Sequence, residues 1–446
     1  MVDLTPGGPG SQPRVLPLSR LMLAALVILG SAGDVAAQPT SPPDRPDLGT
    51  VPEPGTVRLS FEAALDRAGR SAPRLGPRRE AMASIAPLQD AADLAITQPP
   101  TIQSYGGVRY LADGRARPEV QVAYWHNIPM RGVGSARSKV AAATTRQAEA
   151  DLQIAQADSR LAAALAWVDA RVAREIVDHR RRSLEDAESL AALARDRVEA
   201  GADDPSLGAI ARAVVGSSRA ELLRALGSET EAIMGLAHAI GLSPDQRIEA
   251  VGPTELRLVG PREREVLAAA DRGHPSLQRT APDVAMAEAQ ADLALASNAP
   301  NLSFGPSVTR EGGGDWVFLA QISVPLPVVE PGAFAAAQAR RSGRVRLAED
   351  ERMRRQVERD VRLLLHHREH AAEERELLER EAVVPARDAL RIARARFEAG
   401  ATDVVPLLSV RRELLAAEAR LLEATAEVMR AEVRLAHATG KLGGAP

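Results

Sequence analysis

Two stretches of the sequence decide how the chain is organised: Arg197-Val-Glu-Ala-Gly-Ala-Asp203 and, 199 residues later, Arg396-Phe-Glu-Ala-Gly-Ala-Thr402. A second pair has the same offset, since Ala237-His-Ala-Ile-Gly241 recurs as Ala436-His-Ala-Thr-Gly440. Two weaker pairs keep nearly this spacing: Ile128-Pro129 with Val324-Pro325, and Ser71-Ala-Pro-Arg-Leu75 with Gly273-His-Pro-Ser-Leu277. Four pairs in one order indicate a tandem duplication with copies of about 200 residues. We place the first copy at 57–250 and the second at 251–446.

Long helices dominate each copy. The residues before and after Gly201 and Gly400 have high helix propensity and no strand signal, and glycine just past a helix end adopts the left-handed conformation without penalty. The sequence therefore predicts long helices at about 135–200, 205–241, 333–399 and 404–440. Pro385 lies inside the third of these and predicts a kink. Two shorter helices precede the strands of each copy, at about 60–69 and 81–96 and at about 262–272 and 282–297.

The last long helix carries an unbroken heptad seam, with apolar residues at alternating spacings of three and four. Its members are Leu407, Val410, Leu414, Ala417, Leu421, Ala424, Val428, Ala431 and Leu435. Such a seam requires a partner helix at coiled-coil geometry. An isolated coiled-coil rod would account for the helices, but it would not account for the strands.

Four strands are predicted, at about 101–111, 119–128, 301–310 and 315–324. The last two alternate between an apolar face and a face of mainly polar residues, which is the pattern of a membrane barrel strand with lipid on one side and water on the other. Seven of the 11 aromatic residues lie in these four runs. We interpret them as an interfacial aromatic girdle, although aromatic residues also favour strands in general. They are Tyr105, Tyr110, Tyr124, Trp125, Phe304, Trp316 and Phe318.

Four strands cannot close a barrel, and an open sheet edge cannot face lipid because its backbone groups would lack partners. Two copies of the chain would supply eight strands and three would supply twelve. Side chains fill the interior of an eight-stranded barrel, whereas twelve strands leave room for a passage. A conducting pore therefore favours a homotrimer. The fold class that we expect is mostly α with a transmembrane β part.

The N-terminus and the composition narrow the setting. Residues 1–37 combine Arg14 and Arg20 with a short apolar core and a small-residue site ending at Ala37, which predicts an export signal rather than a membrane anchor. Residues 38–56 form a proline-rich lead-in. The net charge of -3 gives no reason to expect nucleic acid, and the absence of cysteine excludes disulfides, thiolate metal sites and a lipid anchor on cysteine.

These features resemble the TolC family of outer-membrane efflux proteins. The motifs that carry the resemblance are Leu59-Ser-Phe-Glu-Ala-Ala-Leu65, the strand-to-helix turns Asn127-Ile-Pro-Met-Arg-Gly132 and Val324-Pro-Leu-Pro327, and the hairpin motif at Arg396 with its copy. Pro129 and Pro325 mark the two turns. The turns are most similar to the heavy-metal (cobalt-zinc-cadmium type) branch, although Glu330-Pro331-Gly332 matches that branch loosely.

The resemblance implies a trimer with a twelve-stranded barrel in the outer-membrane lipid of a Gram-negative bacterium and a large periplasmic helical tunnel. It also implies docking to a periplasmic adaptor protein and an inner-membrane pump, of the resistance-nodulation-division (RND) type. The implied function is passive export of metal ions or small toxic compounds. A periplasmic coiled-coil adaptor is the alternative, and a structural coiled coil is a third; the duplicated hairpin argues against an adaptor.

The predicted hairpin tips carry acidic residues close to the glycines. Gly201 is followed by Asp203 and Asp204, and Gly400 by Asp403. The family's pore aspartates lie further along the returning helix, where this chain has Pro406 and Ser409. The tip aspartates could form an acidic entrance or contact an adaptor, but acidic residues just before a helix are also common N-terminal caps.

No catalytic constellation is present in the sequence. His366 and His370 lie one helical turn apart, a spacing that can bind a metal. No third ligand is identifiable, so we favour a solvated or inter-helix histidine cluster over a metal site. There is no nucleophile elbow, phosphate loop or paired carboxylate. The sequence therefore predicts neither an enzyme nor a bound cofactor.

Overall fold

The structure, a computed structural model, describes residues 56–94, 99–129, 132–243, 245–298, 301–324 and 332–443. All of these belong to one compact unit, Pro54–Pro446. The predicted export signal and nearly all of the proline-rich lead-in lie outside the described residues. So does Pro325 in the second strand-to-helix turn.

The first copy contains two strands flanked by helices. Its elements are β1 (Val57–Leu59), α1 (Phe61–Ser71), the 3₁₀ turn η1 (Pro73–Leu75), α2 (Gly76–Ala83), α3 (Ile85–Ala92), β2 (Thr101–Tyr110), β3 (Ala116–Pro129), α4 (Val133–Glu199) and α5 (Pro205–Ile240).

The second copy repeats this plan. Its elements are β4 (Ile248–Ala250), α6 (Glu263–Gly273), the 3₁₀ turn η2 (Pro275–Arg279), α7 (Thr280–Ser297), β5 (Asn301–Arg310), β6 (Trp316–Ser323), α8 (Ala333–Leu377), the π turn η3 (Leu378–Val383), α9 (Val384–Glu398), α10 (Val404–Ala438) and the 3₁₀ turn η4 (Lys441–Gly443).

Two predicted helices differ from the structure, and proline explains both differences. The helix expected at 81–96 is divided into α2 and α3, because Pro87 has no N–H for the carbonyl of Ala83, at which α2 ends. The kink expected at Pro385 is a full π turn, Leu378–Val383, in which the N–H of Val384 bonds to the carbonyl of Glu379, five residues back.

The centre of the helical core joins both copies. Trp167 of α4 is fully buried, donates its indole N–H to the Leu59 carbonyl at 3.0 Å and packs edge to face on Phe61 at 5.3 Å between ring centroids. Strand β1 pairs in parallel with β4, with Val57 opposite Ile248. The first strand of each copy therefore meets its equivalent beside this core, which fixes the two copies against each other.

Each copy closes on itself through a glycine at the end of its returning helix. Gly241 and Gly440 both have positive φ, at 71° and 75°. A Cβ at Gly241 would overlap with the carbonyl oxygen of Ser71 at the end of α1, and one at Gly440 would approach the carbonyl of Gly273 at the end of α6. The repeated His-Ala-x-Gly motif is therefore needed both for the left-handed turn and for this close approach.

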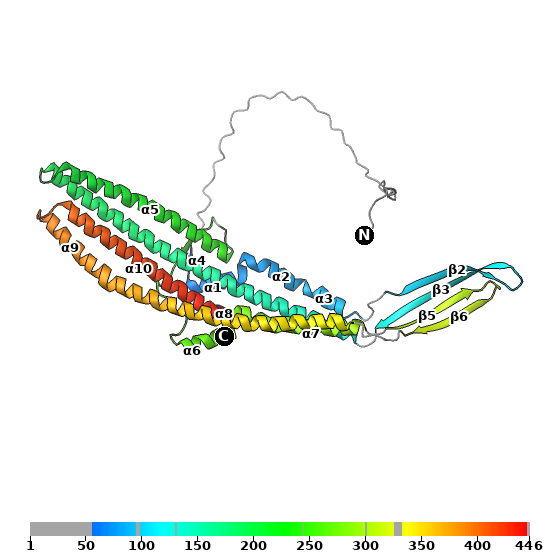
Figure 1. Cartoon of the computed structure of the whole chain (residues 1–446). Helices are drawn as coiled ribbons and strands as arrows, with labels where there is room; N and C mark the ends of the chain where they lie inside the picture. The colour runs from blue at the N-terminus through cyan, green and yellow to red at the C-terminus, as the bar shows by residue number, and fades with distance from the viewer. Residues whose placement is uncertain are drawn as a thin grey trace, which may run out of the picture. The chain divides into compact units, whose positions relative to one another are not determined.

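The predicted heptad seam on α10 is confirmed. Six of its members, Leu407, Leu414, Ala417, Ala424, Ala431 and Leu435, are buried, and the other three are half buried. The seam packs α10 against both copies, because α10 contacts α4 as well as α8 and α9 (Figure 1).

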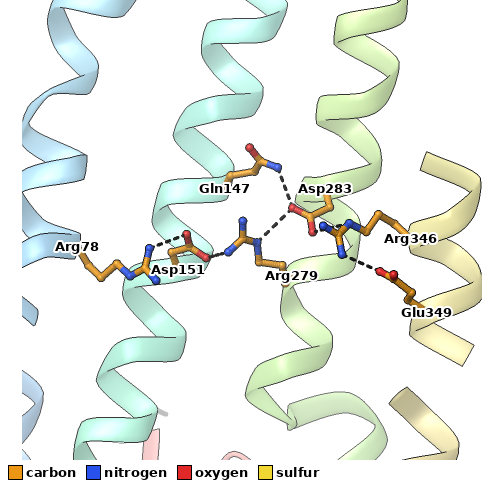
Figure 2. A network of polar contacts seen from close by, with 7 residues as sticks. All are labelled: Arg78, Gln147, Asp151, Arg279, Asp283, Arg346 and Glu349. Atoms are coloured by element: carbon orange, nitrogen blue, oxygen red, sulfur yellow. Dashed lines mark hydrogen bonds and ion pairs between the residues drawn. The ribbon is translucent and has the colours of Figure 1, made fainter. Parts of the chain in front are cut away.

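A polar network crosses from the first copy to the second nearer the strands. Asp151 of α4 accepts from Arg78 of α2 at 3.2 Å and from Arg279 of η2, and Arg279 also reaches Asp283 of α7 at 3.2 Å. Gln147 donates to the same Asp283 carboxylate at 2.7 Å (Figure 2). Arg346 of α8 extends the network from Asp283 to Glu349. Polar and charged side chains therefore link five helical segments where α7 packs on α4.

The four long strands form one antiparallel sheet in the order β2-β3-β5-β6 (Figure 1). Strands β3 and β5 come from different copies and pair from Val120 opposite Arg310 to Pro129 opposite Asn301. Each copy therefore contributes one hairpin, and among the described residues the outer strands β2 and β6 each have one edge that pairs with no other strand.

Among the described residues, no helix combines the length and the apolarity needed to span a membrane.

Candidate functional site

The two faces of the sheet differ in chemistry. Pairing places Ile102 opposite Tyr124, Val122 opposite Val308, and Val308 opposite Phe318, so that even-numbered residues of all four strands share one face. This face is largely apolar and exposed: Ile102, Phe318 and Ile322 are each more than 70% accessible. An apolar sheet face this open is the kind of surface that lipid or a partner covers.

The register corrects part of the predicted aromatic girdle. Five of the seven aromatic residues, Tyr110, Tyr124, Phe304, Trp316 and Phe318, lie on the even-numbered apolar face. Tyr105 and Trp125 have odd numbers and lie on the opposite face, where the Tyr105 hydroxyl bonds to Gln103 at 3.1 Å. The sequence indicated alternation for the two strands of the second copy, and only the pairing shows which residues of β2 and β3 share a face.

The odd-numbered face carries polar side chains and one charged cluster. Arg109 donates to Glu119 at 2.6 and 3.1 Å and to Glu311 at 3.4 and 3.5 Å. Glu311 belongs to the turn between β5 and β6, so the cluster joins the hairpins of the two copies close to their turns. Further along this face, Ser303 donates to Asn127 at 2.5 Å. A face of this composition is compatible with water.

At the other ends of the long helices, the tip aspartates act as caps. The Asp204 carboxylate accepts from the Ser206 N–H at 2.8 Å, and the Asp403 carboxylate accepts from the Val405 N–H at 3.0 Å. Hydrogen bonds from the side chain and the backbone of Ser206 lower the pKa of Asp204. Both carboxylates therefore start a returning helix, as acidic N-caps do.

Asp203 has a different role, in a contact that joins the two tips. Arg197 donates to Asp203 at 2.8 and 2.9 Å, and this hydrogen bonding lowers the pKa of the Asp203 carboxyl. The same guanidinium donates to the carbonyl of Phe397 at 2.8 Å and lies 4.8 Å from the centroid of its ring. Phe397 is fully buried between the tips. The end of α4 is therefore attached to the end of α9.

Sequence reasoning missed Arg411, a second link between the copies. Its side chain is buried and donates from α10 to the backbone carbonyl and, at 2.9 Å, to the hydroxyl of Ser183 on α4. Burial lowers the pKa of this guanidinium, although an arginine remains charged. No motif in the sequence distinguishes Arg411 from the exposed Arg412 beside it. Helical periodicity alone could have placed it on the buried face.

A groove of about 630 Å³ lies beside Arg411, between α5 and α10. Its walls combine apolar residues such as Ile210, Val214 and Leu415 with Arg180 and Glu221. The groove separates the two returning helices a short distance from the tips. It is a surface on which another helix could pack.

The candidate metal ligands remain an incomplete pair. His366 and His370 lie edge to face with 4.3 Å between ring centroids, and His370 is 3.8 Å from Glu373. Within the described part of the chain, no group of three or more histidine, aspartate or glutamate side chains is arranged to hold a metal ion.

Comparison with known proteins agrees with this architecture. The family model described as outer membrane efflux protein matches residues 266–441. The solved structure of the outer-membrane channel OprN is 17% identical and covers 86% of this chain and 90% of its own, with a TM-score of 0.68. CusC, whose structures are described in terms of transmembrane channel formation, is 15% identical and covers 85% of this chain and 92% of its own, with a TM-score of 0.67. The open MtrE outer-membrane channel of Neisseria gonorrhoeae is 20% identical and covers 86% of this chain and 89% of its own, with a TM-score of 0.62. No curated protein sequence matches the chain.

Proposed function

We infer that this chain is an outer membrane efflux protein and serves as the outer-membrane channel component of a tripartite efflux system. The observation that carries the inference is the sheet built from both copies, with an exposed apolar and aromatic face, a polar face and two unpaired edges. Such a sheet is suited to a wall between lipid and water once its edges are paired.

Three copies of the chain would pair those edges. Strand β6 of one copy would lie beside β2 of the next, so that twelve strands close a barrel with the polar face inside. The five aromatic residues on the apolar face would then form the girdle toward lipid. The Arg109, Glu119 and Glu311 cluster would line the passage near the hairpin turns, at the outer mouth.

The long helices would extend into the periplasm as a tunnel that ends at Gly201 and Gly400. These tips would receive a periplasmic adaptor protein, which in turn connects to an inner-membrane pump of the RND type. The capped ends support this role, because Asp204 and Asp403 hold both turns in defined conformations that a partner could recognise. The groove between α5 and α10 offers the adaptor an adjacent surface for a helix.

The chain would act as a passive conduit for metal ions or small toxic compounds. The odd-numbered face of the sheet supplies polar and charged groups to the passage, and the energy for export would come from the pump. Export of metal ions is the more specific of these two proposals. It depends on the similarity of the strand-to-helix turns to the heavy-metal branch. Deleting the gene and measuring growth inhibition by divalent metals and by hydrophobic toxicants would separate the two cargo classes.

The function itself is tested by purifying the full chain from the outer-membrane fraction in detergent. We expect a native mass of three chains, dissociation on heating and stepwise ion conductance in planar lipid bilayers. A soluble periplasmic monomer without conductance would rule out the channel and favour a coiled-coil adaptor.

A further inference from the structure

Within the chain, the two repeats pack against each other along one interface, which we call the internal seam. This internal seam shows which contacts a similar interface between two chains would need. Two arginines hold the internal seam together: Arg197 of α4 reaches Phe397 of α9, and Arg411 of α10 reaches Ser183 of α4. In both contacts, the arginine binds a backbone carbonyl of the other copy. Helix α4, which runs from the strands to the tip in the first copy, thus packs on the second copy; we call it and its equivalent, α8 with η3 and α9, the outgoing helices.

The same arginines occur again at the offset of 199 residues, but without partners. Arg396 corresponds to Arg197, and Arg212 corresponds to Arg411. Both are exposed, and neither side chain has a hydrogen bond or ion pair among the described residues. Their expected acceptors also exist at this offset, since Val198 corresponds to Phe397 and Ala382 to Ser183.

The surfaces around Arg212 and Arg411 differ in the same way. On α10, a stripe comprising Arg411, Ala426, Met429 and Val433 is buried. The equivalent stripe on α5 comprises Arg212, Gly227, Thr230 and Met234, and all four are exposed. The sequences of α5 and α10 form equivalent helices, so the difference arises because α4 covers the stripe on α10 and no described element covers the one on α5.

The π turn Leu378–Val383 provides an acceptor for Arg212. The carbonyl of Arg380 would normally bond to the N–H of Val384, but that N–H bonds to Glu379. The residue after Val384 is Pro385, which has no N–H. The carbonyl of Arg380 therefore lacks both the donor of an α turn, Val384, and the donor of a π turn, residue 385. A backbone acceptor without these donors is a favourable partner for an arginine. The turn includes Ala382, the position equivalent to Ser183.

We propose that two neighbouring chains pack together through the α5 stripe of the first chain and through η3 and α9 of the second chain. Arg212 of the first chain donates to the carbonyls of the π turn of the second chain. Arg396 of the second chain donates to the carbonyl of Val198 at the tip of the first chain. The exposed apolar residues Leu377, Val384 and Ile392 are seven and eight residues apart, a spacing that places them on one face of the helix, and the docked chain covers them. This inference rests on the proposed function, which requires the copies to form a closed ring.

Cysteine crosslinking tests the seam directly, because the chain has no native cysteine. The full chain carrying Arg212→Cys and Ala382→Cys is treated with a short bismaleimide in native membranes. We expect covalent dimers and trimers on denaturing gels. The matched control, Arg411→Cys with Ser183→Cys, should form a link only within a single chain and migrate as a monomer. Each single-cysteine variant should give no multimers.

A second pair, Arg396→Cys with Val198→Cys, tests the tip contact independently and should also give multimers. If the control pair reacts while both test pairs yield only monomers, and the native mass is still that of three chains, the proposed seam is wrong although the channel assignment stands. A native mass of one chain would overturn both.

Discussion

At the scale of single residues, Glu432 shows how a buried charge is held in this chain. Its carboxylate is 5% exposed and accepts from the backbone N–H groups of Leu258 and Val259 at 3.0 and 3.1 Å and from Arg368 at 3.2 Å. Glu432 therefore attaches the segment after β4 to both α8 and α10. Three donors would be left without an acceptor if the carboxylate were removed.

We accordingly expect Glu432→Ala to lower the free energy of unfolding by about 3–5 kcal/mol, because it leaves the N–H groups of Leu258 and Val259 without their acceptor and the half-buried Arg368 without its carboxylate partner. The control is Glu427→Ala on the same helix, where an exposed carboxylate pairs with Arg430 and the loss should be below about 1 kcal/mol. Thermal unfolding of the detergent-purified protein measures both. Equal effects of the two changes would contradict this account of Glu432.

A pair of half-buried histidines should make stability depend on pH. His274 and His437 have 6.2 Å between ring centroids, and burial lowers the pKa of each; His437 also lowers that of His274, while Asp158 raises both. Their pKa values in the folded chain are thus lower than the value of about 6.5 in the unfolded chain. The unfolded chain therefore binds more protons as the pH falls through this value.

Stability should then be fully present above about pH 7 and decrease as the pH falls from about 6.5 toward the lower pKa values of the folded chain. Melting temperatures between pH 8 and pH 5 would show this decrease. In the variant with His274→Gln and His437→Gln, the decrease over the same interval should be clearly smaller. An unchanged pH profile in that variant would show that other groups are responsible.

At the scale of elements, the π turn accounts for part of the drift in the repeat offset. The offset is 199 residues at the tips. Upstream of the turn, the pattern of buried residues on α4 (Ser159, Ala163 and Trp167) recurs on α8 (Val357, Val361 and Leu365) at an offset of 198. A π turn accommodates one extra residue without rotating the helix faces on either side. The buried faces of α8 and α9 therefore both stay in register with α10.

Deleting Arg380, an exposed residue of the π turn, should therefore convert the turn to α-helix and lower stability by only about 1 kcal/mol when combined with Pro385→Ala. Deleting the equally exposed Glu351 from α8 should be far more damaging, because it rotates one part of the helix by about 100° relative to the other. Circular dichroism and thermal unfolding compare the two deletions. A folded, stable Glu351 deletion would refute this view of the register.

The central pairing of the sheet depends on one glycine. A Cβ at Gly305 would overlap with the carbonyl of Tyr124 on the neighbouring strand β3, so Gly305→Ala should separate β3 from β5 at a cost of about 3 kcal/mol or more. Gly107→Ala on β2 is the matched control, since a Cβ there meets nothing within 4 Å. The yield of heat-sensitive trimers in membranes is the measurement, and comparable yields for both variants would contradict the prediction.

At the scale of the whole molecule, the proposed wall separates lipid from water at alternate residues. Single cysteines at Thr309 and Gln321 on the polar face should therefore react quickly with a charged, water-soluble maleimide in membranes. Cysteines at Val308 and Phe318 on the apolar face should react slowly. The reverse order would place water on the wrong side of the sheet, whereas equal rates would indicate that neither face is covered by lipid.

The sequence by itself determined the duplication, the four strands and the long helices, because each depends on a local pattern. Helix-ending glycines at 201 and 400, the seam on α10 and the alternation in β5 and β6 are properties of a few neighbouring residues. Pro385 also predicted an irregularity in the third long helix. The sequence could not show that this irregularity is a π turn rather than a simple kink.

Only the tertiary structure decided which side chains meet across the two copies. Tyr105 and Trp125 could be assigned to the polar face only after strand register was known, because a shift of one residue exchanges the faces. Asp203 became an ion-pair partner and Asp204 a cap through the geometry of a single turn. Arg411 and Arg212 have the same place in the repeat, and they differ because, in the part of the chain that the structure describes, another helix covers Arg411 and none covers Arg212.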